Sequence, residues 1–182
     1  MMIIGQLMIE HRLIERMVKV VDKALENAGR EGSLNPLDIE AFVDFMRFYA
    51  DKCHHGKEEG LLFKELAKKD ISREHKKIMG DLISDHFYGR SLVDRLVSLN
   101  SEYKAGEKGK LTELISVFSK LAVFYSAHIQ KEDKTFFIPT MNYFEHKEHS
   151  AMLEACKVFD LTSDFSKYQK MVLSLEAALK TR

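Results

Sequence analysis

Apolar residues recur at helical spacing over long stretches of this sequence, and few helix-breaking residues interrupt them. Only two prolines and nine glycines occur in 182 residues. Apolar side chains at positions i, i+3, i+4 and i+7 predict amphipathic helices, whereas strands would alternate with a period of two. We therefore expect an all-α protein. Because 45% of the residues are hydrophobic, the chain can build one sizeable core, and we predict a single domain over residues 1–182.

Four long helices are expected, at residues 3–28, 36–69, 72–99 and 111–138. Gly29 should end the first helix, and Asn35 followed by Pro36 provides an N-cap and a first helical residue for the second. Ser72 can cap the third helix. The fourth should weaken just before Pro139, because a proline disfavours helical geometry in the residue that precedes it.

Long amphipathic helices joined by short polar loops predict an up-down-up-down four-helix bundle, here over residues 1–139. A C-terminal extension, residues 140–182, should add two shorter helices at about 152–159 and 166–179, separated by an interruption at residues 160–165. In such bundles, metal and cofactor sites are built from side chains that face the central axis.

Charge and cysteine usage exclude several classes of protein. The 28 basic and 28 acidic residues balance, without long runs of one sign, so no nucleic-acid partner is expected. No apolar run reaches the 18 residues of a membrane span, and no basic region precedes the first apolar residues as in a signal peptide. Cys53 and Cys156 stand far apart, which fits a reducing compartment. We expect a cytoplasmic protein with no membrane partner.

The most informative motif is a histidine followed four residues later by a glutamate. Residues at this spacing share one face of a helix, so both side chains can reach one site. Random placement would give about 0.75 such pairs. The sequence has four, at His11/Glu15, His54/Glu58, His55/Glu59 and His128/Glu132.

Two of these pairs, His54/Glu58 and His55/Glu59, overlap on one helix, and they cannot both face the core. His54 and His55 should point about 100° apart on one helix, so that only one of them faces inward. The apolar face of the helix favours His54, which leaves His55 and Glu59 as supporting or surface groups.

Each of the four expected helices carries one histidine on its apolar face, namely His11, His54, His86 and His128. A single histidine in such a place is usually a satisfied core residue, but four on four helices, with two glutamates, are different. Burying these groups without a cation costs several kcal/mol per ion. Imidazole and carboxylate without thiolate suit iron, manganese or zinc, and carboxylates from two helices favour a pair of metal ions about 3.5–4 Å apart.

The segments LMIEHRLIERM, DKCHHGKEEGLLF, ISDHFYGRSLV and AHIQKEDKTFFIP resemble, in order, the four signature stretches of the hemerythrin HHE cation-binding family. The resemblance covers residues 7–139. It implies a centre of two iron ions, in preference to zinc or manganese, with Glu58 and Glu132 bridging them. The implied ligands are His11, His54, Glu58, His86, His128 and Glu132.

The resemblance also implies a function. The protein would bind two iron ions and interact with dioxygen, nitric oxide or peroxide in sensing, iron storage or stress protection. The alternative is a di-iron enzyme or an iron-sulfur-centre repair protein acting on damage by nitric oxide or peroxide. The oxygen carriers of the family have a second histidine four residues after the first on the third helix, where this chain has Arg90. This departure disfavours simple reversible oxygen carriage.

Several assignments stay open on the sequence. Asp133 stands where the carriers use an aspartate ligand, although the neighbouring Glu132 has the better helical azimuth. His75 lies 11 residues before His86, about 16 Å along a helix. Whether Asp133, His55 or His75 joins the site is undecided, and so is the oligomeric state. Glu15 is a candidate for orienting a ligand, and Tyr49, Tyr88 and Tyr125 are candidate hydrogen-bond donors near the site.

Overall fold

A computed structural model describes residues 2–161 and 164–180, in which every regular element is a helix. Among these residues, no helix combines the length and apolar character needed to cross a membrane. The first long helix is α1 (Ile3–Glu31). The second passes through α2 (Pro36–Asp44), the π-helical stretches η1 (Phe45–His55) and η2 (Glu58–Phe63), and α3 (Lys64–Leu66).

The third long helix is α4 (Arg73–Lys104), which the 3-10 turn η3 (Lys108–Lys110) joins to the fourth. The fourth combines α5 (Leu111–Lys131), the π-helical η4 (Glu132–Phe136) and α6 (Phe137–Thr140). After the 3-10 turn η5 (Met141–Tyr143), two further helices follow, α7 (His146–Leu161) and α8 (Phe165–Lys180).

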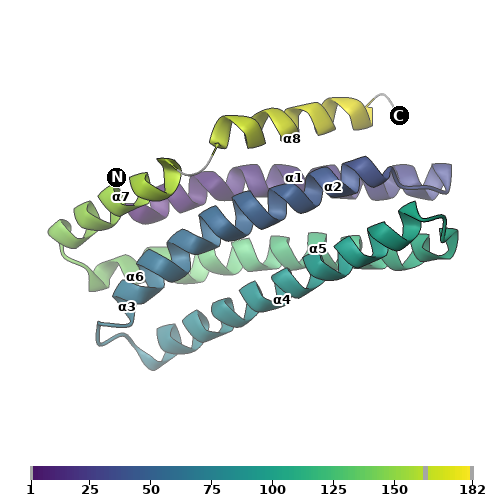
Figure 1. Ribbon diagram of the computed structural model, residues 1–182. Coiled ribbons are helices and arrows are strands. Elements are labelled where there is room, and N and C mark those ends of the chain that lie inside the picture. The colour runs from purple at the N-terminus through teal and green to yellow at the C-terminus, as the bar shows by residue number, and fades with distance from the viewer. Residues whose placement is uncertain (1, 162–163, 181–182) are drawn as a thin grey trace.

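The four long helices run alternately up and down, as Figure 1 shows. α5 packs against both α1 and α4, and α2 packs against α4. α8 lies along α1, while α7 covers the end of the bundle that holds the N-terminus. The predicted all-α bundle with additional C-terminal helices is therefore confirmed. The predicted interruption at residues 160–165 includes 162 and 163, which lie outside the described residues.

Two predicted helix starts are confirmed at the atomic level. The Asn35 side chain accepts a hydrogen bond from the Leu37 amide, with Pro36 at the first helical position. The Ser72 hydroxyl oxygen accepts a hydrogen bond from the His75 amide at 3.1 Å. Such caps satisfy amides that have no partner within the helix.

Three predicted helix ends are wrong, those of the first, third and fourth helices. α4 continues to Lys104, five residues past the predicted end at residue 99. α1 continues through Gly29 and ends at Gly32, whose φ of 66° is the left-handed conformation that glycine adopts without strain. The fourth helix continues to Thr140. Pro139 follows directly after the change from π-helical to α-helical winding, where Phe136 has a φ of −113° rather than the usual value of about −63° for an α-helix.

Two clusters of buried apolar side chains fill the bundle, one around Met17, Phe42 and Leu121 and the other around Leu7 and Phe136. Between them lies a layer of buried polar residues, which consists of Glu10, His11, His54, His55, Lys57, Glu58, His86, His128 and Glu132. Because buried polar groups cost free energy unless they are paired, this layer is where a site is expected.

Candidate metal centre

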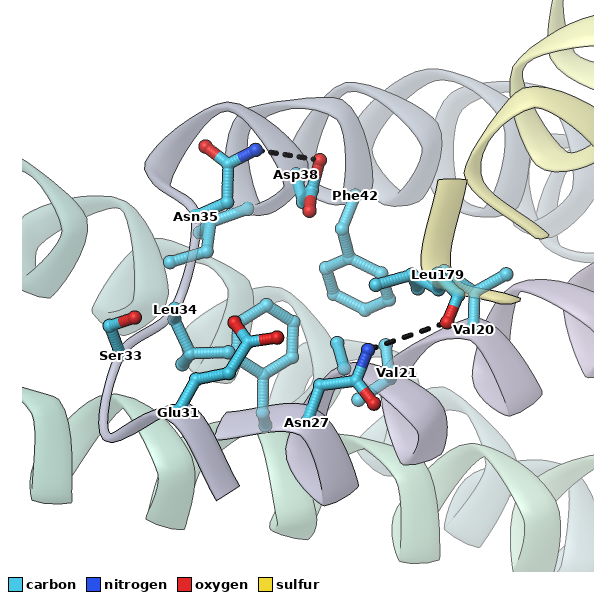
Figure 2. Close-up of a pocket in the computed structure, with 13 residues that line it drawn as sticks. Val20, Val21, Asn27, Glu31, Ser33, Leu34, Asn35, Asp38, Phe42 and Leu179 are labelled. Carbon is cyan, nitrogen blue, oxygen red and sulfur yellow. Dashed lines mark hydrogen bonds between the residues drawn. The ribbon is translucent and has the colours of Figure 1, made fainter. Parts of the chain in front are cut away.

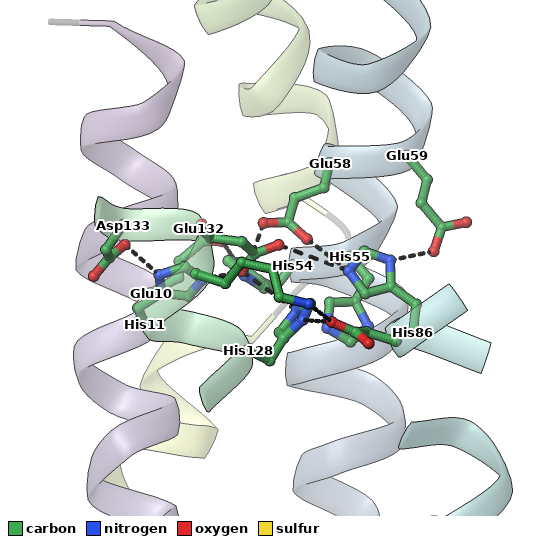
Figure 3. A network of polar contacts seen from close by, with 12 residues as sticks. Glu10, His11, His54, His55, Glu58, Glu59, His86, His128, Glu132 and Asp133 are labelled. Atoms are coloured by element: carbon green, nitrogen blue, oxygen red, sulfur yellow. Dashed lines mark hydrogen bonds and ion pairs between the residues drawn. The ribbon is translucent and has the colours of Figure 1, made fainter. Parts of the chain in front are cut away.

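All four long helices contribute to the polar layer, and Figure 3 shows their side chains converging. The six residues predicted from the sequence are all brought together here, and His55 joins them. None of the seven is more than 2% exposed. They are His11 on α1, His54 and His55 on η1, Glu58 on η2, His86 on α4, His128 on α5 and Glu132 on η4.

The seven side chains form two groups, in each of which the potential ligand atoms all lie within 4.8 Å of one another. One group is His11, His54, Glu58 and Glu132, and the other is His55, Glu58, His86 and His128. Glu58 belongs to both groups. Its Oε1 lies 3.3 Å from His54 Nε2 and its Oε2 lies 3.3 Å from His86 Nε2, so its two oxygens face different groups.

Glu132 also contacts histidines of both groups. Its Oε2 lies 3.2 Å from His11 Nε2 and 3.3 Å from His128 Nε2, and its Oε1 lies 3.8 Å from His86 Nε2. Ligand atoms about 2.1 Å from one ion lie roughly 3.0–3.4 Å apart in octahedral or tetrahedral geometry. The spacing of these atoms therefore fits cation coordination.

The inward-facing atoms have no hydrogen-bond partners within the described part of the chain, although several lie within 3.5 Å of one another. They are Nε2 of His11, His54, His86 and His128 and both carboxylate oxygens of Glu58 and Glu132. Buried polar atoms without partners are rare in folded proteins. Imidazole nitrogens and carboxylate oxygens all offer lone pairs to a cation, so metal ions at this place would satisfy all eight atoms.

The outer nitrogen of each histidine faces a carboxylate. The Nδ1 contacts are His11 with Asp133 at 2.7 Å, His54 with Glu10 at 2.9 Å, His55 with Asp51 at 3.3 Å, His86 with Glu59 at 2.7 Å and His128 with Asp85 at 3.3 Å. A proton on Nδ1 that is donated to a carboxylate leaves the Nε2 lone pair free to bind a metal. The five carboxylates therefore orient the five rings toward the centre.

Each of these carboxylates is held in turn by a cationic side chain. Arg90 binds both Asp51 and Glu59, at 2.7 and 2.6 Å. The remaining pairs are Arg12 with Asp133, Lys57 with Glu10 and Lys131 with Asp85. The histidines are thus fixed by an extended network rather than by single contacts.

Electrostatic interactions within the cluster favour the charged forms of Glu58 and His54. Burial acts to raise the pKa of Glu58, but His54 and His86 lower that pKa well below its usual value. Burial acts against the imidazolium form of His54, yet Glu58 and Glu10 raise its pKa to about 10. Burial and the nearby His86 lower the pKa of His55 well below its usual value. Without a metal, protons on some histidines therefore balance the buried carboxylates.

The prediction that only one of His54 and His55 faces the core is wrong, because both are buried and they belong to different groups. The prediction assumed the 100° rotation of an α-helix. Both residues lie in the π-helical η1, where a wider turn rotates less per residue. His55 thus adds a fifth histidine to the buried layer, from the second helix.

The other open candidates lie outside the two groups. Asp133 contacts the outer nitrogen of His11, and His75 contacts the Tyr143 hydroxyl at 2.9 Å. Glu15 pairs with Arg12 at the surface and orients no ligand. Among the three tyrosines, Tyr88 is 48% exposed, whereas Tyr49 and Tyr125 are buried. The Tyr125 ring lies parallel to His55, with centroids 6.4 Å apart.

A second feature, shown in Figure 2, is a small cavity at the opposite end of the bundle. Its volume of about 30 Å³ is enough for about two water molecules. Asn27 donates a hydrogen bond to the Leu179 carbonyl beside it, which ties α1 to α8. None of the seven clustered residues lines this cavity, so it is separate from the candidate site.

A helical bundle with buried histidines and carboxylates around unpaired ligand atoms defines a cation-binding protein. In agreement with this, the family model of the hemerythrin HHE cation binding domain matches residues 2–138. The chain belongs to this family. Comparisons with curated proteins and with solved structures found no match. α7 and α8 lie beyond the matched residues.

Proposed function

We propose that this protein holds two iron ions and that the pair interacts with dioxygen, nitric oxide or peroxide in sensing, iron storage or stress protection. The observation that carries the proposal is the convergence of eight unpaired ligand atoms in one buried layer. His11 and His54 would hold one ion, and His55, His86 and His128 the other. Glu58 and Glu132 would bridge the two ions.

The choice of iron rests on ligand chemistry and on the family. Imidazole and carboxylate ligands without thiolate suit iron, zinc and manganese, and the hemerythrin resemblance favours iron. When bound, an iron pair would supply redox chemistry and a coordination position for a small ligand. Cys53 and Cys156 are both buried and stand far apart in the sequence, which agrees with the reducing cytoplasm that we propose as the location.

The surroundings of the cluster favour a small ligand and restrict water. Phe137 stacks on His11 and Phe63 on His86, with centroids 5.6 and 6.0 Å apart. A surface cavity of about 190 Å³ is bounded in part by Asp51, Arg90 and Tyr125. Asp51 contacts His55, so this cavity is the route that we propose for a diatomic molecule or peroxide.

Metal analysis tests the proposal directly. We expect about two iron ions per chain in protein purified from iron-supplemented cells. The double variant His54→Ala, His128→Ala removes one ligand from each group and should retain far less iron. His75→Ala is the matched control, because His75 lies outside both groups. The assignment fails if the double variant keeps about two iron ions per chain.

Optical spectra identify the metal and its reactivity. An iron pair should give charge-transfer absorption that changes on reduction and on exposure to dioxygen, whereas zinc has neither redox chemistry nor such a spectrum. Turnover of peroxide or nitric oxide, compared with Glu58→Ala, then separates a binding protein from an enzyme. Many turnovers per chain that are lost in Glu58→Ala would overturn the binding-protein assignment in favour of an enzyme.

A further inference from the structure

Lys57 is a fully buried lysine that connects the candidate metal centre to the C-terminal helices. Its ammonium group donates to Glu10 Oε1 and to Asp160 Oδ1, each at 2.5 Å. It also lies over the ring of Phe165, 5.0 Å from the centroid. A buried ammonium is costly unless charged partners compensate it, so these contacts account for its position.

Glu10 uses both of its oxygens in this connection. Oε1 accepts from Lys57, and Oε2 lies 2.9 Å from His54 Nδ1. Asp160 is similarly shared, because its Oδ2 accepts a hydrogen bond from the Gln6 side chain at 2.6 Å. A continuous polar path therefore runs from α7 through Lys57 and Glu10 to a candidate ligand.

An apolar contact joins the same two segments. A Cβ atom on Gly56 would lie 3.1 Å from Phe159 Cε1, and one on Gly60 would lie 3.6 Å from Phe159 Cζ. The two glycines thus allow α7 to approach the helix that carries His54, His55 and Glu58. The polar path and the glycine contact fix the same stretch of chain independently.

The two groups differ in their dependence on α7. Arg90, Lys131 and Arg12, which hold the carboxylates behind the other four histidines, all lie within the residues matched by the family model. Only the carboxylate behind His54 is connected through Lys57 to Asp160, beyond the matched region.

We propose that Lys57 and Asp160 are positioning residues for His54, so that docking of α7 and cation binding in the His11/His54 group stabilise each other. The inference rests on the proposed metal binding. Docked α7 holds Lys57 and Glu10 in place, and Glu10 orients the His54 ring. Because coupling between two binding events is reciprocal, a cation bound to His54 must also favour docked α7.

A titration of the metal-free full-length chain with cobalt(II), followed by its visible absorption, tests the first half of this coupling. The wild type should bind two equivalents of cobalt. Asp160→Asn should lower the affinity for one of them by about tenfold and leave the affinity for the other unchanged. Asp160→Glu keeps the carboxylate and should bind more nearly like the wild type.

Glu176→Gln is the matched control. Glu176 joins α8 to α1 through two hydrogen bonds with Arg16, at 2.9 and 2.8 Å, and contacts no histidine. Glu176→Gln should leave the cobalt affinity of both equivalents unchanged. If Asp160→Asn binds both equivalents of cobalt with the same affinities as Glu176→Gln, the positioning role of Asp160 is wrong. If the wild-type chain binds no cobalt, the proposed metal binding itself fails, which is a different result.

Amide hydrogen exchange tests the reciprocal half without any variant. In the wild type, the amides of α7 should exchange about tenfold more slowly with cobalt bound than without it. In Asp160→Asn this difference should shrink, and in Glu176→Gln it should persist. Equal exchange of α7 in the metal-free and cobalt-bound wild type would overturn the coupling.

Discussion

At the scale of single residues, Arg90 has an organising role that its position on the third helix did not indicate. Its guanidinium binds Asp51 and Glu59, which contact the outer nitrogens of His55 and His86. The two histidine rings stack, with centroids 3.9 Å apart and an angle of 10°. One arginine thus fixes two neighbouring members of the same group.

Replacing Arg90 by leucine should weaken metal binding at this group, because both carboxylates lose the cation that holds them. We expect about a tenfold loss of affinity for one of the two equivalents, measured by metal titration. Arg95→Leu is the control, since Arg95 lies on the same helix and pairs with the exposed Glu113 at the surface. Similar affinities in the two variants would show that Arg90 does not organise the site.

Metal binding should release protons and strengthen as the pH rises. Burial opposes the charged form of His86, but Glu132, Glu58 and Glu59 raise its pKa to about 11, and the pKa of His54 is raised to about 10. Both imidazoles therefore carry protons at neutral pH, and a metal must displace them.

About two protons per chain should be released at pH 7.5, about one for each ion, so the apparent affinity for each ion should rise roughly tenfold per pH unit and fall correspondingly on acidification. A pH indicator in weakly buffered solution measures the release. Binding without proton release would mean that these histidines are already neutral.

Six of the seven inward-facing residues could be predicted from the sequence, His55 being the exception, but which carboxylate supports which histidine could not. Helical spacing places His54 and Glu58 on one face, and the structure brings these two side chains together. In contrast, Glu10 supports His54 from α1, and Asp85 supports His128 from α4. Spacing along one helix carries no information on such contacts between helices. The pair of Asp51 and His55 is the exception, because both lie on η1 four residues apart.

At the scale of elements, the π-helical stretches decide the composition of the site. The sequence predicted one continuous helix over residues 36–69, and the chain is helical from Pro36 to Leu66. It did not predict the change of winding within η1 and η2, because hydrophobic periodicity does not resolve a local shift in hydrogen bonding. This change brings His55 into the core beside His54.

The glycines of this helix give a test of how closely α7 packs. Alanine at an interior helical position is favoured over glycine by up to about 1 kcal/mol. Gly60→Ala should therefore raise the free energy of unfolding, because its Cβ would make an ordinary contact with Phe159. In Gly56→Ala the closer contact at 3.1 Å should offset the gain. Thermal melts measure both, and equal stabilisation would contradict the close packing of Phe159 against Gly56.

At the scale of the whole molecule, a charged layer separates two apolar clusters. The bundle was predictable because each long helix carries its own apolar stripe. The placement of α7 and α8 was not, since it depends on contacts such as Lys57 with Asp160 and Arg16 with Glu176. The layer interrupts an otherwise apolar interior, so the stability of the whole domain should depend on what neutralises it.

The domain should therefore be more stable with metal bound. A ligand that binds only the folded chain adds about 2.7 kcal/mol per site at a free concentration 100 times its dissociation constant. For a chain of this size, that corresponds to a rise in melting temperature of roughly 5–10 °C per site. Thermal melts at increasing iron(II) concentration, without dioxygen, measure the effect.

The double variant Glu58→Gln, Glu132→Gln is the control for that experiment, because amides keep the shape of both side chains but remove the negative charges that would hold the two ions. Its melting temperature should change little with iron. Bound iron in the buried layer must stabilise the fold, because the eight unpaired atoms reach it only when the helices are assembled. If the wild type binds two iron ions and melts at the same temperature as the metal-free chain, the ions must lie elsewhere, on a surface that the unfolded chain also offers.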